Sequence, residues 1–160
     1  MNIAIYPGTF DPFTNGRKDL VQRAATNIFD KVYICVAESS DKATFFSLSE
    51  RIDLAEKATK DISNIEVCGF NGLLVDFADK LKAKVILRGL RVVSDFEYEF
   101  QMSSMNKKLN ENIESIFLTP SESYAFLSSS LVKEIAKLGG DISSFVSNDV
   151  KIALEKKYNK

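Results

Sequence analysis

The chain alternates short apolar runs with stretches whose apolar residues recur at helical spacing, and this alternation constrains the fold more than any other feature. Short apolar runs bounded by turn formers predict buried strands, whereas apolar residues three and four positions apart predict helices. Strands that alternate with helices form a parallel sheet with helices on both faces. The five predicted strands cover residues 3–6, 32–37, 65–70, 84–87 and 113–118.

The predicted helices fill the segments between the strands and the C-terminal part of the chain. Two of them begin with the Ser-x-x-Glu spacing of a capping box, at Ser47–Glu50 and at Ser94–Glu97. Because no linker or repeat interrupts the pattern, residues 1–160 are expected to form a single Rossmann-like α/β domain, with C-terminal helices over about 128–158. The helices are expected over 17–29, 52–58, 73–81, 94–109, 131–138 and 149–158.

The composition excludes several classes of function. The 21 basic and 22 acidic residues leave a formal charge of -1, which argues against nucleic-acid or membrane-surface binding through bulk charge. The absence of histidine excludes histidine-dependent triads and imidazole zinc sites, and no metal ligand set is predicted. No signal peptide or membrane-spanning run is visible, so we expect a cytoplasmic protein in which Cys35 and Cys68 are buried free thiols.

The stretch from Ala4 to Arg17 runs from a strand through a loop rich in turn formers into a helix. A turn of this kind aims backbone N–H groups and the positive end of a helix dipole at one point, which suits phosphate. A plain connecting loop has the same local pattern, and Thr9 and Thr14 could simply close turns. A phosphate site here therefore needs support from elsewhere in the chain.

Support comes from the residues that follow the other strands, because ligands of such sheets bind beyond the carboxyl ends of the strands. Arg88 and Arg91 suit phosphate, since guanidinium groups make paired charge-assisted hydrogen bonds. The alternative is that the two arginines pair with nearby carboxylates, namely Asp95, Glu97 or Glu99.

Two further segments carry groups that suit phosphate. The three serines at 128–130 stand at a predicted helix N-terminus, where simple capping needs only one of them. Lys42 lies in the polar stretch after the second strand and could be either a ligand or a solvated loop charge. Together with the opening loop, these segments predict a convergent anion site.

Four motifs in this order resemble those of the bacterial phosphopantetheine adenylyltransferases, a family of the nucleotidyltransferase superfamily. They are Tyr-Pro-Gly-Thr-Phe-Asp-Pro-Phe-Thr-Asn-Gly at 6–16, Arg-Gly-Leu-Arg at 88–91, Ser-Asp-Phe-Glu-Tyr-Glu at 94–99 and Ser-Ser-Ser-Leu-Val-Lys-Glu at 128–134. The resemblance implies transfer of the adenylyl group of ATP to 4'-phosphopantetheine, giving dephospho-coenzyme A and pyrophosphate, the penultimate step of coenzyme A synthesis. It also implies Mg²⁺ on the ATP phosphates, a homohexamer, and coenzyme A as an inhibitor.

The resemblance assigns candidate residues to both substrates. Phosphopantetheine would be held by Thr9, Lys42, Leu74 and Arg88, with Thr9 and Lys42 near the attacking phosphate. Because that phosphate is already an anionic nucleophile, alignment and charge stabilisation suffice, and a direct in-line displacement is expected. ATP would lie against Thr9, Phe10, Arg17, Gly89, Leu90, Arg91, Glu99, Tyr124, Ala125, Phe126, Leu127, Ser128, Ser129 and Ser130.

One residue departs from the family pattern. The superfamily signature is (His or Thr)-x-Gly-His, whose last histidine stabilises the transition state, and here it reads Thr14-Asn15-Gly16-Arg17. Arg17 could take over as a permanent cation, could leave a catalytically impaired nucleotide-binding homologue, or could be an engineered change. The other phosphate-binding residues are present, which favours an enzyme with Arg17, Lys42 and Thr9 as catalytic residues. A nicotinate mononucleotide adenylyltransferase is the enzymatic alternative, but the block at 88–99 fits it less well.

Overall fold

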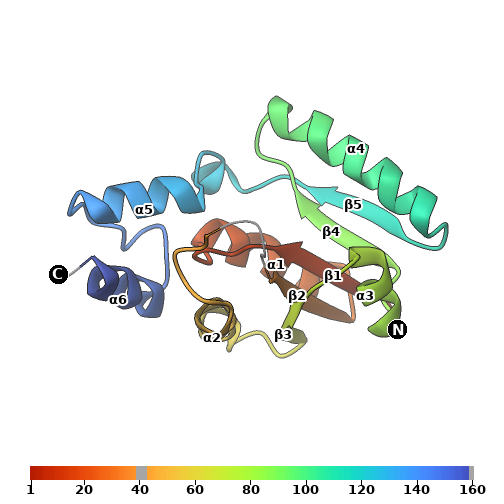
Figure 1. The fold of residues 1–160 in the computed structure, drawn as a ribbon, viewed down its shortest axis with the longest axis horizontal. Helices are drawn as coiled ribbons and strands as arrows, with labels where there is room; N and C mark the ends of the chain where they lie inside the picture. Colours follow the sequence, from red (N-terminus) through yellow and green to blue (C-terminus); the bar gives the residue numbers. More distant parts are fainter. Residues whose placement is uncertain (39–42, 159–160) are drawn as a thin grey trace.

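A computed structural model describes residues 1–38 and 43–158 of the chain (Figure 1). Its centre is a parallel sheet with the strand order β3-β2-β1-β4-β5. The chain builds outward from β1 to β3 and then crosses back to place β4 on the other side of β1, so the order reverses between β1 and β4. The prediction of a five-stranded parallel sheet is confirmed. The strands are β1 (Ile3–Gly8), β2 (Lys31–Ala37), β3 (Ile65–Phe70), β4 (Val85–Gly89) and β5 (Glu114–Leu118).

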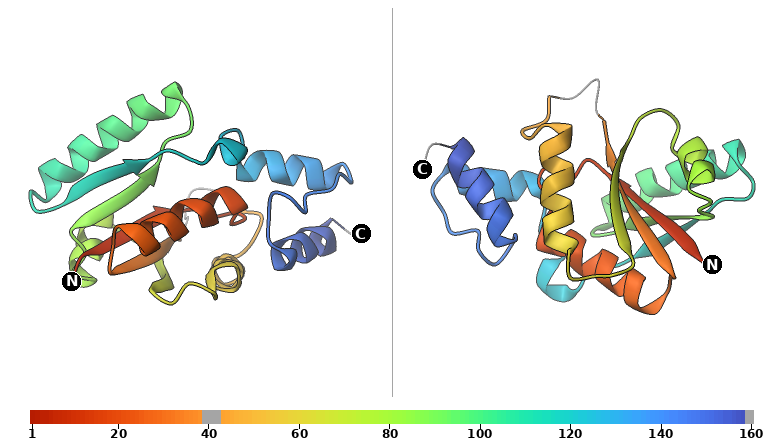
Figure 2. Two further views of the ribbon diagram at one scale, coloured as in Figure 1. Left: turned by 180° about the vertical axis from the view of Figure 1, so that it is seen from behind. Right: turned by 90° about the horizontal axis from the view of Figure 1, so that it is seen from below.

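Helices cover both faces of this sheet. The helices α1 and α2 pack on one face and α3 packs on the other, while α4 lies beside β5. The last two helices pack against each other and against α2 at the end of the molecule away from the N-terminus (Figure 2). The helical elements are α1 (Asn15–Asn27), α2 (Leu48–Thr59), α3 (Leu74–Lys80), α4 (Val93–Leu109), the short 3-10 helix η1 (Glu122–Tyr124), α5 (Ser129–Lys137) and α6 (Asn148–Lys157).

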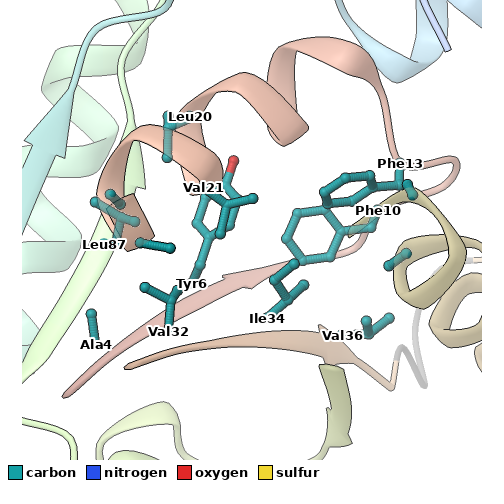
Figure 3. Packing of buried hydrophobic residues seen from close by; sticks show 14 of the residues in the cluster. Ala4, Tyr6, Phe10, Phe13, Leu20, Val21, Val32, Ile34, Val36 and Leu87 are labelled. Carbon is teal, nitrogen blue, oxygen red and sulfur yellow. The ribbon is translucent and has the colours of Figure 1, made fainter. Parts of the chain in front are cut away.

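Successive residues of the central strand pack on opposite faces of the sheet. Tyr6 packs in the cluster on the α1 face, whereas Ile5 belongs to the cluster under α3. Figure 3 shows Tyr6 followed by two further buried aromatic residues, Phe10 and Phe13, whose ring centroids are spaced 5.3 and 5.4 Å along the series. Burial of both faces explains why the strands read as continuous apolar runs rather than as alternating patterns. The aromatic series anchors the loop that follows β1.

Some predicted helix ends are confirmed and others move by a few residues. The capping box at Ser47 forms, since its hydroxyl accepts from the Glu50 N–H at 3.2 Å and the Glu50 carboxylate accepts from the Ser47 N–H at 2.7 Å. Helix α1 begins at Asn15 rather than at Arg17, because the Thr14 side chain caps it. Similarly, α5 begins at Ser129 rather than at residue 131, with Ser128 as the N-cap.

The prediction of a capping box at Ser94 is wrong. Helix α4 begins at Val93, so Ser94 already lies inside its first turn. The carboxylate of Asp95 instead accepts from the backbone N–H groups of Arg91 and Val92, at 3.2 and 3.3 Å. An acidic side chain in the first turn satisfies free amides as well as a serine would, and it also complements the helix dipole.

Three further observations bear on the predictions. Strand β4 continues to Gly89, so Arg88 belongs to the strand rather than to the loop after it. Both cysteines are free as predicted, but only Cys35 is buried, because Cys68 lies half-buried on the edge strand β3. Within residues 1–38 and 43–158, no helix has the length and apolar character needed to cross a membrane.

Candidate active site

A cavity of about 650 Å³ opens at the carboxyl ends of β1 and β4, where the strand order reverses. This is the position at which open α/β sheets bind their ligands, and the volume is in the range of small-molecule sites. Many of the predicted site residues line it: Thr9, Phe10, Arg17, Leu74, Arg88, Arg91, Glu99, Ser128, Ser129 and Ser130.

The remaining predicted residues are placed differently. Gly89, Tyr124 and Leu127 line a smaller crevice that shares Arg17 and Arg91 with the cavity. Neither the cavity nor the crevice is lined by Leu90, Ala125 or Phe126. Lys42 falls outside the residues that the structure describes, although the next two residues, Ala43 and Thr44, line the cavity.

The loop after β1 exposes Thr9 to the cavity. Phe10 adopts a positive φ of 51° and is buried, and its ring packs against Gly8. A Cβ at Gly8 would lie 2.8 Å from the tip of that ring, so only glycine fits under it. Anchoring by the buried ring leaves the small, exposed Thr9 hydroxyl at the cavity.

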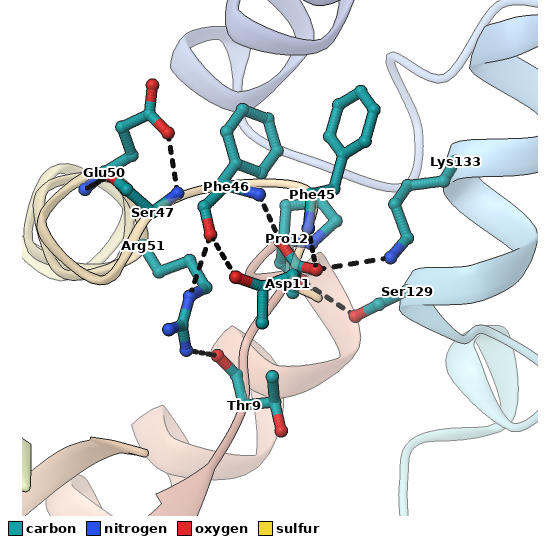
Figure 4. Close-up of polar contacts among 11 residues, drawn as sticks. Thr9, Asp11, Pro12, Phe45, Phe46, Ser47, Glu50, Arg51, Ser129 and Lys133 are labelled. Carbon is teal, nitrogen blue, oxygen red and sulfur yellow. Dashed lines mark hydrogen bonds and ion pairs between the residues drawn. The ribbon is translucent and has the colours of Figure 1, made fainter. Parts of the chain in front are cut away.

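Asp11 joins three parts of the cavity wall (Figure 4). Its carboxylate accepts from the backbone N–H groups of Phe45 and Phe46 at 2.7 and 2.9 Å, and from Lys133 Nζ on α5 at 3.4 Å. Asp11 is 7% exposed, so these charge-assisted bonds satisfy an anion that would otherwise be costly to bury. The β1–α1 loop, the segment before α2 and helix α5 are thereby held together.

Arg51 makes a second buried junction beside Asp11. It is 2% exposed and donates to three backbone carbonyls, those of Phe46 (3.2 Å), Thr9 (2.8 Å) and Ala37 (2.9 Å). The planar guanidinium suits this task because its donors point in several fixed directions. The N–H of Phe46 binds Asp11 while its carbonyl binds Arg51, so the two junctions share one peptide segment.

Arg17 stands in the first turn of α1, between the cavity and the crevice. Its Nη1 donates to the Tyr6 hydroxyl at 3.2 Å. The neighbouring Tyr6 hydroxyl raises the pKa of Arg17 further above its ordinary value, although burial opposes the shift, so the side chain remains a cation at every physiological pH. Glycine at 89 leaves room for Leu20, since a Cβ there would lie 2.8 Å from that side chain, whereas its distance of 3.8 Å from Arg17 Nη1 would be an ordinary contact.

The two arginines of the Arg-Gly-Leu-Arg motif both have carboxylate partners. Arg88 makes a paired interaction with buried Glu99, through Nε at 2.9 Å and Nη2 at 2.6 Å, and its Nη1 donates to the Pro7 carbonyl at 2.9 Å. Arg91 donates to the Leu127 carbonyl at 3.0 Å and lies 3.7 Å from Asp95. The alternative of pairing with carboxylates therefore describes Arg88 well, and Arg91 is the less tightly held of the two cations.

Each of the three serines at the start of α5 has a different environment. Ser128 caps the helix by accepting from the Leu131 N–H at 3.1 Å. Ser129 donates to the Pro12 carbonyl at 2.7 Å and ties α5 to the opening loop. Ser130 is exposed and lines the cavity. The helix N-terminus thus faces the cavity with its dipole and at least one accessible hydroxyl.

Sequence reasoning missed part of the cavity wall. Tyr98, Met102 and Asn106 line it from α4, and their i, i+4 spacing was a signal that they share one helix face. Lys133 also lines it, although it belongs to the motif at 128–134. The contribution of Asp11 had no local signal, because its partners lie more than 30 residues away in the chain.

The arrangement of cations, hydroxyls and a helix N-terminus around a cavity at the sheet's switch point is that of a nucleotidyltransferase. Residues 5–135 match the model of the cytidylyltransferase-like family, to which the chain therefore belongs. The structure resembles that of the Plasmodium falciparum nicotinic acid mononucleotide adenylyltransferase complexed with NaAD, with a TM-score of 0.71 and 16% identity over 99% of this chain and 96% of that one. At that identity the likeness shows the fold alone.

Curated relatives place the chain in a narrower family within the cytidylyltransferase-like proteins. A phosphopantetheine adenylyltransferase of Methylococcus capsulatus is 59% identical over 99% of this chain and 98% of its own length. Enzymes of the same name from Azoarcus sp. and Hahella chejuensis are 55% and 54% identical, and the matches cover 97% and 99% of this chain and 94% and 98% of theirs. The chain is a member of the phosphopantetheine adenylyltransferase family.

Proposed function

We propose that the chain transfers the adenylyl group of ATP to 4'-phosphopantetheine, giving dephospho-coenzyme A and pyrophosphate. The observation that carries this proposal is the convergence of Thr9, Arg17, Arg91 and the N-terminus of α5 on one cavity. High identity to enzymes of that name over nearly the whole chain supports it. The catalytically impaired alternative rests on Arg17 alone, and no contact among the described residues of the cavity favours it.

We assign the two substrates to opposite sides of the cavity. ATP would lie toward Arg91, the α5 serines and the crevice that begins at Gly89, where cations and helix amides suit a triphosphate. The acceptor would lie toward Leu74 and Arg88, with its phosphate near Thr9. The family resemblance assigns Lys42 to the same phosphate. Because Arg88 is paired with Glu99, its side chain is held in place beside this subsite and has few N–H groups left to donate to a ligand.

The mechanism that suits these residues is direct in-line displacement. The acceptor phosphate oxygen attacks the α-phosphorus of ATP while the bond to the pyrophosphate oxygen breaks, so no protein nucleophile or strong base is needed. Negative charge spreads over the α-phosphate oxygens in the transition state. Arg17 lies at the junction of the cavity and the crevice and can donate to that charge, as the family's histidine does.

Mg²⁺ would arrive with the nucleotide. Among residues 1–38 and 43–158, no group of three metal-ligating side chains is close enough to form a metal cage. The two buried carboxylates at the cavity, Asp11 and Glu99, are already committed to N–H groups and to Arg88. This donor set fits a Mg²⁺ ion that is held by substrate phosphates and water, and the ion would neutralise charge on the phosphates.

The outer surface of α4 supports the proposal of a homohexamer. Four of its large apolar residues do not line the cavity and are 53–59% exposed, namely Phe96, Phe100, Met105 and Leu109. Exposed apolar side chains gathered on one helix mark an interaction surface. Native mass spectrometry is expected to show six chains, and a Met105→Glu variant is expected to dissociate. We further propose a cytoplasmic location and inhibition by coenzyme A, which contains both halves of the product.

The test is pyrophosphate release from ATP, Mg²⁺ and 4'-phosphopantetheine, with the parent chain compared to Arg17→His and Arg17→Ala. We expect the parent to turn over, and Arg17→Ala to lose roughly 10²–10³-fold in rate, the cost of one preorganised donor. ATP affinity, measured by calorimetry, serves as the control for folding of the site. A parent that binds ATP but turns over only as Arg17→His would instead be a disabled homologue.

A further inference from the structure

The two cysteines of the chain form a pair that the proposed adenylyl transfer does not use. Strands β2 and β3 run parallel in a register that places Cys35 directly beside Cys68, so both side chains point to the same face of the sheet. The two sulfur atoms lie 4.0 Å apart and both thiols are free. Neighbouring strands are separated by about 4.8 Å, which is within the Cα separation that a disulfide spans.

The two thiols differ in environment in the way that an attacking and a resolving thiol do. Cys35 is fully buried in the cluster under α3, whereas Cys68 is half-buried on the edge strand. The hydrogen bond with Cys68 and burial together raise the pKa of Cys35. Cys68 is the sulfur that a small oxidant can reach, and burial disfavours a thiolate at Cys35, so the attacking thiolate forms on Cys68.

We propose that Cys35 and Cys68 form a reversible thiol-oxidation site, which hydrogen peroxide converts into an intrachain disulfide. The Cys68 thiolate attacks one oxygen of the peroxide and the O–O bond breaks, which leaves a sulfenic acid and hydroxide. The Cys35 sulfur then attacks the Cys68 sulfur, the S–O bond breaks, and the Cys35 proton leaves in the water formed. Two thiols and one peroxide become one disulfide and two waters, and two small thiols reverse the step.

Cys35 and Cys68 lie next to the candidate active site, just before the residues of β2 and β3 that line the cavity. Ala37 and Phe70 are the next residues of the two strands on the same face, they are partners in the same register, and both line the cavity. The oxidation site is therefore separate from the residues proposed to hold phosphate, and it sits beneath the cavity wall that leads to Leu74. Its test does not depend on the proposed enzymatic function.

The experiment treats the reduced full-length chain with hydrogen peroxide, blocks remaining thiols with N-ethylmaleimide and analyses intact and digested protein by mass spectrometry. We expect a mass loss of about 2 Da, no blocked thiols, and a peptide pair joined through Cys35 and Cys68. Dithiothreitol should restore both thiols. Digestion separates this product from methionine oxidation, which adds mass elsewhere.

Two variants test the assigned roles. In Cys35→Ala, Cys68 should stop at a sulfenic acid that dimedone traps, whereas in Cys68→Ala the buried Cys35 should stay reduced. Circular dichroism checks that each variant folds. The proposal is overturned if the parent keeps both thiols at a peroxide dose that oxidises glutathione, or if it forms only disulfides between chains. It is equally overturned if Cys35 reacts in Cys68→Ala as fast as Cys68 does in Cys35→Ala.

Discussion

Removal of the Asp11 carboxylate should destabilise the chain more than removal of any one surface charge. Asp11→Ala breaks two short bonds from the Phe45 and Phe46 N–H groups and leaves those donors without partners beside a buried site. A hydrogen bond to a charged group contributes about 1.5–3 kcal/mol, so the two together amount to about 3–6 kcal/mol. Asp11→Asn keeps one acceptor oxygen and should cost about half as much.

The same structure supplies a matched control. Lys133 meets the same carboxylate at 3.4 Å but is 26% exposed, so Lys133→Ala should cost less than about 1 kcal/mol. Urea denaturation followed by circular dichroism measures all three variants, and the thermal midpoint of Asp11→Ala should fall by about 10 °C. If Asp11→Ala were no less stable than Lys133→Ala, the carboxylate would not hold the three segments together.

Three further predictions follow from other contacts. Arg51→Lys replaces a guanidinium group that donates to three backbone carbonyls with a single ammonium group. The free energy of unfolding, measured by urea denaturation, should fall by about 2–4 kcal/mol, and an unchanged midpoint would contradict this. The raised pKa of Arg17 keeps its side chain charged, so no ionisation of this residue should appear in the pH profile of the parent's turnover between pH 5 and 8. The rate of Arg17→His should instead fall as pH rises through about 6.5 if the residue contributes a positive charge. The hydrogen bond from the Ser47 N–H lowers the pKa of Glu50, so the stability that Glu50 contributes is present above about pH 4.3 and is lost as pH falls through the lower folded-state pKa. The difference in urea midpoint between the parent and Glu50→Gln should therefore be full at pH 7 and shrink below about pH 4, and a constant difference would refute the assignment.

Local patterns were sufficient for the elements of the fold. The five apolar runs became the five parallel strands, because helices cover both faces of the sheet and most strand side chains therefore pack against apolar neighbours. The box at Ser47 was also predictable, since its partners are only three residues apart. The capping box predicted at Ser94 does not form, because the carboxylate of Asp95, one residue further on, accepts from the free amides instead.

Contacts between distant segments were not predictable from local patterns. Motif resemblance placed Arg88 in the site, but the sequence left open whether it would pair with Glu99, and the structure shows that it does. The junctions at Asp11 and Arg51 depend on backbone atoms of segments far along the chain. Nearly every residue has a backbone donor and acceptor, so the sequence does not indicate which of them a side chain will bind. The pairing of Cys35 with Cys68 depends on the register of β2 against β3, which appears only once the sheet is built.

The choice of acceptor tests the proposed function most directly. Purified chain is incubated with ATP, Mg²⁺ and equal amounts of 4'-phosphopantetheine and nicotinic acid mononucleotide, and the adenylylated products are identified by mass spectrometry. Adenylyl transfer to phosphopantetheine predicts dephospho-coenzyme A and one pyrophosphate for each molecule formed. Adenylylation of nicotinic acid mononucleotide instead, or ATP binding with neither product, would contradict the function proposed for this cavity.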